Sequence, residues 1–105
     1  MTKIQNILNK YPDRIPIVLS SKTYLKGNPL KFIVPYDLTI SKFMVLLRTK
    51  IELKPQEAIF LFVKDTDTGA DIMLQSSVTM ELLYTQYKDK EHLLNLFFEK
   101  EAVFG

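Results

Sequence analysis

Apolar side chains recur at helical spacing between residues 40 and 51. Five of them would lie on one side of a helix: Ile40, Phe43, Met44, Leu47 and Ile51. This stripe predicts the main helix of the chain. Thr39 is its expected N-cap, because a threonine hydroxyl can accept a backbone N–H of the first turn. Arg48 and Lys50 stand near the other end, where cations suit the helix dipole.

Two further stretches have helical spacing. Apolar residues follow Thr2 and Gln5, which have the spacing of a capping box, so we expect a short N-terminal helix over residues 2–10. It would end before Pro12, because the residue before a proline is pushed out of the helical region. A last helix is expected after Ser77, its predicted N-cap, with one apolar stripe formed by Met80, Leu83, Tyr84 and Tyr87.

Four stretches have the pattern of strands. Residues 14–21 and 30–35 alternate between two faces and are joined by a turn at Gly27-Asn28-Pro29, which predicts a hairpin. Residues 58–63 are continuously apolar, so we expect this strand to be buried on both faces and central in its sheet. Residues 92–100 alternate again.

The order of these elements is helix, hairpin, helix, strand, helix, strand. It predicts an α+β domain in which a mixed sheet clasps the main helix. The chain has 105 residues, of which 47% are hydrophobic and 25% are charged, and these values are typical of one globular domain. The sequence contains neither a repeat nor an interdomain linker, so residues 1–105 are expected to form a single domain.

Composition excludes several classes of function. Fourteen Lys and Arg against twelve Asp and Glu leave a net charge of only +2, so no nucleic-acid partner is expected. The chain has no cysteine and a single histidine, His92, which disfavours thiolate chemistry and catalytic zinc. We therefore expect no metal and no cofactor. The longest apolar run, residues 58–63, is too short to span a bilayer, and the N-terminus has no signal-peptide core, so a cytoplasmic location is expected.

Asp65 and Asp67 stand in a polar loop, residues 65–71, directly after an apolar strand. A strand followed by D-x-D resembles the phosphatase loop of the haloacid dehalogenase superfamily, in which the first Asp attacks phosphorus. Gly69 stands where that pattern has Thr or Val, and Lys64 separates the strand from the Asp, so an ordinary solvated loop is favoured. The two carboxylates also fail the EF-hand spacing, because the glycine would come one position too early. We expect no catalytic residue here, and no enzyme.

The second strand of the predicted hairpin offers a binding surface. Lys31 and Ile33 point away from the face that carries Phe32 and Val34. If this strand lies at a sheet edge, its free backbone groups can accept an extended peptide as an additional strand. Alternatively, Lys31 simply protects the edge against aggregation. The periodicity alone favours the second interpretation.

Several blocks of the chain are similar, in order, to the signatures of one family. The blocks are Tyr11-Pro12-Asp13-Arg14-Ile15-Pro16-Ile17, Lys31-Phe32-Ile33-Val34-Pro35-Tyr36-Asp37-Leu38-Thr39, Phe43 to Arg48, Ala58-Ile59-Phe60-Leu61-Phe62-Val63, Leu83-Tyr84 and Val103-Phe104-Gly105. They resemble the GABARAP-type ubiquitin-like modifiers of autophagy. The resemblance covers nearly the whole chain, and it implies a ubiquitin-like β-grasp fold with a core over residues 11–100, a conjugation tail over residues 101–105 and the second strand at a sheet edge.

The resemblance also implies what this edge binds. Partners in the family carry an aromatic-x-x-aliphatic motif flanked by acidic residues, and peptide addition then becomes the favoured interpretation of the edge. The implied aromatic pocket is lined by Ile7, Pro16, Lys31, Ile33 and Leu93. The implied aliphatic pocket is lined by Phe32, Val34, Pro35, Leu38, Phe43 and Leu46, of which Phe43 and Leu46 could instead be ordinary helix core. Contacts to the acidic flank would come from Lys31, Arg48 and Lys50.

Gly105 is the reactive residue that the resemblance implies. Activating and conjugating enzymes would join its carboxylate to phosphatidylethanolamine, which would bring a monomeric cytoplasmic protein to the autophagosome membrane. A non-lipidated adaptor that uses the same edge is the alternative. The chain departs from the family pattern in three places: it lacks an additional N-terminal helix, Lys3 replaces a residue that is often acidic, and the segment 65–76 is several residues longer than usual. Nothing follows Gly105, so we expect either a chain that needs no protease trimming or one already cut at this point.

Overall fold

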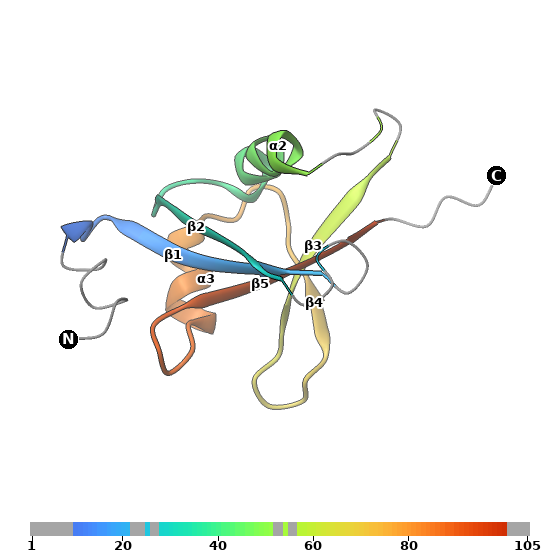
Figure 1. The fold of residues 1–105 in the computed structure, drawn as a ribbon. Coiled ribbons are helices and arrows are strands. Elements are labelled where there is room, and N and C mark those ends of the chain that lie inside the picture. The colour runs from blue at the N-terminus through green and yellow to red at the C-terminus, as the bar shows by residue number, and fades with distance from the viewer. Residues whose placement is uncertain (1–9, 22–24, 26–27, 52–53, 55–56, 101–105) are drawn as a thin grey trace.

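The computed structural model describes residues 10–21, 25, 28–51, 54 and 57–100. In this part of the chain the elements are β1 (Arg14–Ser20), β2 (Leu30–Pro35), α2 (Ile40–Lys50), β3 (Ile59–Lys64), β4 (Asp71–Met73), α3 (Met80–Tyr87) and β5 (Leu94–Lys100) (Figure 1). The expected helix over residues 2–10 lies outside the described residues except for Lys10, and so does the tail over 101–105. Both stay predictions.

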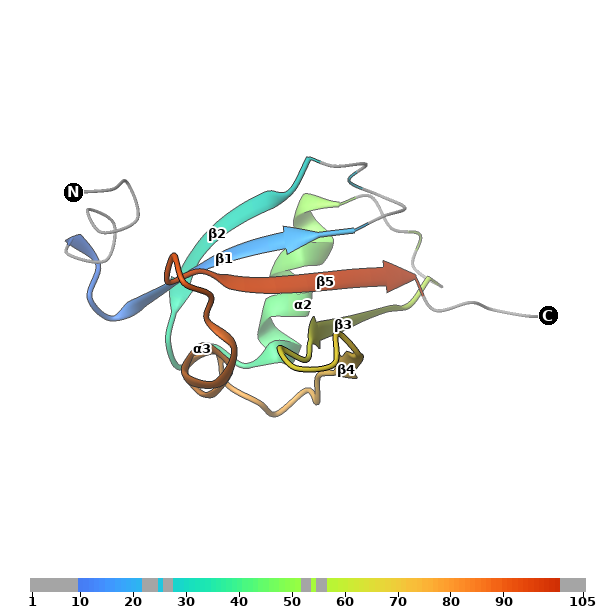
Figure 2. The same ribbon diagram turned by 90° about the horizontal axis from the view of Figure 1, so that it is seen from below.

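The strands form one mixed sheet in the order β2-β1-β5-β3-β4. β1 pairs in parallel with β5, and the other neighbouring pairs are antiparallel. Figure 2 shows α2 lying across one face of this sheet, with α3 towards one end. The predicted hairpin and the α+β class are therefore confirmed, and the mixed sheet packs on the main helix as expected.

The core lies between α2 and the sheet face that it covers. The apolar stripe predicted for the main helix is confirmed, because Ile40, Phe43 and Leu47 are buried on α2. The rings of Phe43 and Phe32 meet edge to face with their centroids 5.2 Å apart, a favoured arrangement of two aromatic side chains. Buried residues from four strands and from α3 complete this core: Ile15, Ile17, Leu19, Val34, Ile59, Leu61, Val63, Met80, Leu83, Leu94, Leu96 and Phe98.

The strand predicted over residues 58–63 is buried on both faces, as expected, and it lies inside the sheet, one place from the middle. β5 is the middle strand, and β3 lies between β5 and β4. On the face away from α2, Phe62 is only 7% exposed. Its ring stacks on that of Phe97 with centroids 5.6 Å apart, and the Lys64 ammonium lies 5.6 Å from the centroid of the Phe62 ring. A continuous apolar run indicates a strand that is buried on both faces. Among the described residues, the burial on this face comes from the side chains of Phe97 and Lys64 and not from a second layer of helices or strands.

The segment predicted as a polar loop over 65–71 contains the start of a strand. β4 pairs antiparallel with β3 and places Asp71 opposite Lys64, with which it forms an ion pair. The turn between them is closed by the Asp65 carboxylate, which accepts the backbone N–H groups of Asp67 at 2.8 Å and Thr68 at 3.3 Å. β4 has only three residues and no alternating apolar pattern, so periodicity could not reveal it.

Two predicted helix caps lie within the described residues, and one of them is confirmed while the other is wrong. Thr39 caps α2, where its hydroxyl accepts the N–H of Lys42 at 3.3 Å. α3 is capped by Thr79, whose hydroxyl accepts the N–H of Leu82 at 3.4 Å, and not by Ser77. The reason lies in the preceding turn, where the N–H of Val78 donates to the carbonyl of Gln75. The helix therefore begins only at the next threonine.

Replacing Thr79 with alanine should lower the free energy of unfolding by about 1 kcal/mol, the usual cost of removing a cap. Chemical denaturation measures this loss. Ser77→Ala is the matched control, and it should change the stability by less than about 0.5 kcal/mol. A larger loss for Ser77→Ala than for Thr79→Ala would contradict the assignment of the cap.

Candidate functional site

β2 lies at one end of the strand order and pairs with β1. Within the part of the chain that the structure describes, no strand covers its other side. Its burial alternates as predicted: Phe32 is half-buried and Val34 buried towards α2, whereas Lys31 and Ile33 are exposed. Such an edge presents backbone N–H and C=O groups to an added strand.

The described residues of the predicted aromatic pocket lie close together. Pro16 on β1 is buried and is the register partner of Ile33, which is 39% exposed. Lys31 lies on the same face of β2 as Ile33. Leu93 is half-buried and directly precedes Leu94, the register partner of Ile17, so it lies beside Pro16. These residues form a surface on the sheet face opposite α2. Ile7, the remaining predicted member, lies outside the described residues.

The predicted aliphatic pocket divides into buried and accessible members. Val34 is 3% exposed and Phe43 is 0% exposed, so both belong to the core, where Phe32 contacts Phe43. Leu46 on α2 is 37% exposed. Pro35 is exposed at the last position of β2, and Leu38 is half-buried on the chain that follows this strand. A ligand on this surface would therefore touch Leu46, Pro35 and Leu38, with the aromatic residues beneath.

The three predicted cations stand in different settings. Lys31 is exposed on the edge strand itself, and Lys50 is exposed at the last position of α2. The guanidinium of Arg48 donates to the carbonyl of Glu57 at 2.9 Å, so it also fastens the end of α2 to the segment before β3. Lys31 is the cation most directly placed to attract an acidic peptide flank.

Asp89 organises the turn that leads from α3 to Leu93. One carboxylate oxygen accepts the N–H groups of Glu91 at 2.8 Å and Leu93 at 3.0 Å, and the other accepts the side-chain amide of Asn95 at 2.7 Å. The N–H of Asp89 in turn donates to the carbonyl of Leu93 at 2.8 Å. The sequence did not single out Asp89, because an acidic residue shortly before a strand gives no further local indication of its role.

The pKa of the Asp89 carboxyl reflects these bonds. Burial acts to raise this pKa, but hydrogen bonds from Leu93, Asn95 and Glu91, together with the charge of His92, leave it below its usual value. Because the pKa is lower in the folded chain, the bonds contribute stability in full above about pH 4, the ordinary range of an Asp carboxyl. That contribution is lost as the pH falls through the lowered pKa.

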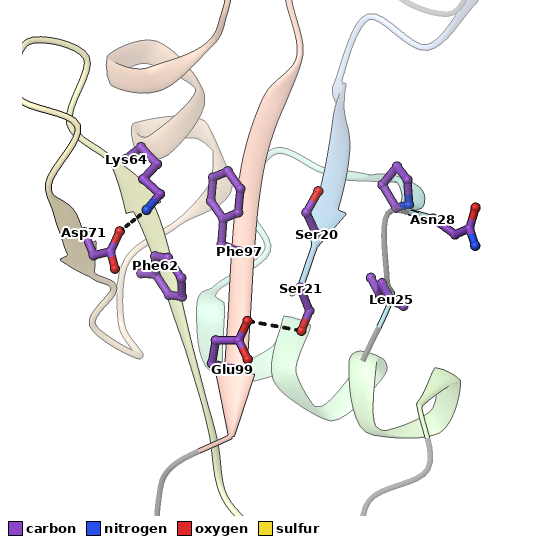
Figure 3. Close-up of a pocket in the computed structure, with 10 residues that line it drawn as sticks. Ser20, Ser21, Leu25, Asn28, Phe62, Lys64, Asp71, Phe97 and Glu99 are labelled. Atoms are coloured by element: carbon purple, nitrogen blue, oxygen red, sulfur yellow. Dashed lines mark hydrogen bonds and ion pairs between the residues drawn. The ribbon is translucent and has the colours of Figure 1, made fainter. Parts of the chain in front are cut away.

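A separate cavity of about 450 Å³ lies on the sheet face away from α2 (Figure 3). Phe62 and Phe97 provide its aromatic side, and the ion pair of Lys64 and Asp71 lies beside them. The full lining is Ser20, Ser21, Leu25, Asn28, Pro29, Phe62, Lys64, Asp71, Phe97 and Glu99. The hydroxyl of Ser21 donates to the Glu99 carboxylate at 3.3 Å. The sequence did not predict this cavity. Its walls come from four strands and the segment after β1, which are spread along the chain.

The side chain of Asp65, considered above as a phosphatase nucleophile, has a structural role. The Asp65 carboxylate is directed onto N–H groups of its own turn, which accounts for it without a substrate. Among the described residues, no three His, Cys, Asp or Glu side chains are grouped closely enough to hold a metal ion. No helix in the described ranges is long and apolar enough to cross a membrane. The surface around β2 therefore remains the leading candidate, and its chemistry suits peptide binding.

Two comparisons with known proteins agree with this arrangement. The model of one protein family, described as autophagy protein Atg8 ubiquitin like, matches residues 1–105. Among solved structures, the crystal structure of Trypanosoma brucei ATG8 is similar, with a TM-score of 0.77 and 31% sequence identity. This similarity covers 97% of the present chain and 85% of the trypanosome chain.

Proposed function

Because the chain belongs to the Atg8 ubiquitin-like family of autophagy proteins, we propose that it is a modifier that is joined to phosphatidylethanolamine and recruits receptors to the autophagosome. The resemblance in the sequence is thereby confirmed at the level of the family, and the fold is the ubiquitin-like α+β fold of that family. Proteins of this family act as ubiquitin-like modifiers and adaptors and not as enzymes.

Gly105 is the proposed point of attachment. Its carboxylate would be adenylated by ATP with release of pyrophosphate, and a thiolate of the activating enzyme would then displace AMP. The acyl group would pass to a thiol of the conjugating enzyme and finally to the amine of phosphatidylethanolamine, which forms an amide and releases the thiol. Glycine suits a tail that must enter narrow clefts, because it has no Cβ. The sequence Val103-Phe104-Gly105 supports this proposal.

The observation that carries the receptor-binding half of the proposal is the edge strand β2. Its outward residues Lys31 and Ile33 are exposed next to the buried Pro16. An extended peptide can pair with this edge through its backbone and place alternate side chains on the two pocket surfaces. Lys31 would attract acidic residues beside the motif.

The remaining elements of the proposal follow from lipid attachment. The chain would meet its activating and conjugating enzymes in the cytoplasm as a monomer, and the lipid would then hold it on the autophagosome membrane. Nucleic acid is not among the proposed partners. A non-lipidated adaptor with the same groove is the second candidate, and the exposed β2 edge supports it equally.

A peptide titration tests the groove that both candidates share. We expect a peptide with acidic residues before an aromatic-x-x-aliphatic motif to shift the NMR signals of residues 31–35. Lys31→Glu should weaken binding by about five- to tenfold, because it replaces an attractive charge with a repulsive one. Absence of shifts at residues 31–35 would remove the groove from both candidates.

A further inference from the structure

The turn between α3 and β5 holds Leu93, a residue of the predicted aromatic pocket, through both of its backbone polar groups. Both backbone polar groups of Leu93 are bonded to Asp89: its N–H donates to the Asp89 carboxylate at 3.0 Å, and its carbonyl accepts the Asp89 N–H at 2.8 Å. The ladder between β1 and β5 begins only at Leu94. Asp89 therefore takes the place of a strand partner for Leu93.

The same turn contains a backbone conformation that needs support. His92 has φ 65°, in the left-handed region, which residues other than glycine rarely adopt. Its N–H donates to the carbonyl of Asp89 at 3.0 Å, and its carbonyl accepts the hydroxyl of Tyr84 at 2.8 Å. The chain turns here just before Leu93, so these bonds set the direction in which Leu93 enters the sheet.

The Asp89 carboxylate also reaches forward into β5. Its second oxygen accepts the side-chain amide of Asn95 at 2.7 Å. Asn95 pairs with Val18 of β1, so the carboxylate connects the turn to the sheet on both sides of Leu94. Leu93 is thus held from the turn and from the strand.

We propose that Asp89 is a positioning residue for receptor peptides, which holds Leu93 as a preformed wall of the aromatic pocket. This inference rests on the proposed function, because it concerns the same groove. A preformed pocket costs less ordering on binding than one that must be assembled. Asp89 would not touch the peptide, so its effect would depend on whether the peptide presents an aromatic residue to Leu93.

A double-mutant cycle between the protein and the peptide tests this dependence. Calorimetry would compare the intact chain with Asp89→Ala, each with a Trp-x-x-Leu peptide and with the same peptide carrying Ala in place of Trp. We expect Asp89→Ala to weaken binding of the Trp peptide by about tenfold and of the Ala peptide by less than about twofold. An equal change for both peptides, or no change for the Trp peptide, would overturn the inference.

Asp65→Ala is the matched control. The Asp65 carboxylate closes the turn between β3 and β4 by accepting two N–H groups, as Asp89 does in its own turn. Loss of that turn should leave the binding of both peptides unchanged within about twofold. A selective loss of the Trp peptide with Asp65→Ala would show that the effect is general loosening of the fold, and would also overturn the inference.

Two further variants keep the test decisive if Asp89→Ala folds poorly. Asp89→Asn retains an amide oxygen that can accept both N–H groups, and its NH2 group can donate to Asn95 once the Asn95 amide turns over, so it should bind the Trp peptide within about threefold of the intact chain. His92→Gly suits the left-handed conformation and should bind at least as tightly as the intact chain. A tenfold loss with His92→Gly would contradict the proposed role of the turn.

If the intact chain binds neither peptide, the proposed groove itself fails, and the inference falls with it.

Discussion

Replacing Gly105 with alanine is expected to stop the transfer of the chain to phosphatidylethanolamine almost completely. The added Cβ would lie beside the reacting carboxylate, in clefts that must enclose the tail closely. We expect the rate of conjugate formation to fall by at least about a hundredfold, which corresponds to roughly 2.7 kcal/mol of barrier. Mass spectrometry of a mixture with ATP, the activating and conjugating enzymes and phosphatidylethanolamine liposomes measures the lipid-linked product.

Met73→Ala provides the control for this experiment. Met73 is 63% exposed on β4, the strand at the far end of the sheet order from β2, and its replacement should leave conjugation unchanged. Conjugate formation by Gly105→Ala at the normal rate would show that the transfer does not require glycine at this position, against the close enclosure proposed for the tail. If the intact chain itself forms no conjugate under these conditions, the adaptor without lipid becomes the favoured function.

The sequence predicts those features of the fold that arise from local periodicity. The stripe from Ile40 to Ile51 and the cap at Thr39 depend on neighbours within one or two helical turns, so they can be read from the residues alone. The same holds for the two faces of β2, where Lys31 and Ile33 alternate with buried neighbours. Alternation therefore identified the exposed side of the candidate site correctly.

The features that the sequence missed depend on contacts that the periodicity of apolar residues does not reveal. β4 is a strand because it pairs with β3, and its three residues carry no period of their own. Phe62 is covered because Phe97, far along the chain, lies beside it. The cap at Thr79 depends on the bond between Val78 and Gln75 in the turn before α3. In each case the deciding partner is a backbone group or a ring that the local pattern does not reveal.

The candidate site contains residues that the sequence predicts and residues that only the structure identifies. The resemblance implied that Phe43 lines the aliphatic pocket, with ordinary helix core as the alternative, and its 0% exposure agrees with the alternative. Asp89 has no apolar period and no place in the resemblance, yet its bonds fix Leu93. A residue that lines a pocket can be predicted from the motif that the ligand contacts. A residue that holds the lining in place, such as Asp89, is found only from its hydrogen bonds.

Replacing Leu46 with glutamate should weaken binding of an aromatic-x-x-aliphatic peptide by about thirtyfold, which corresponds to roughly 2 kcal/mol. Leu46 is 37% exposed on α2, so the change removes apolar contact surface and introduces a charge without opening the core. The peptide's aliphatic residue would then have to desolvate a carboxylate, which is costly without a partner. Calorimetry with the Trp-x-x-Leu peptide measures the loss.

Val45→Glu separates this effect from a general effect of charge on α2. Val45 is 68% exposed and adjoins Leu46 in sequence, but successive residues of a helix point about 100° apart. Both variants add the same charge to the same helix, and glutamate is a good helix former in each. Val45→Glu should therefore bind the peptide within about twofold of the intact chain. Equal losses for the two variants would place the peptide elsewhere on the helix, whereas a loss confined to Leu46→Glu would locate the aliphatic residue between α2 and the end of β2.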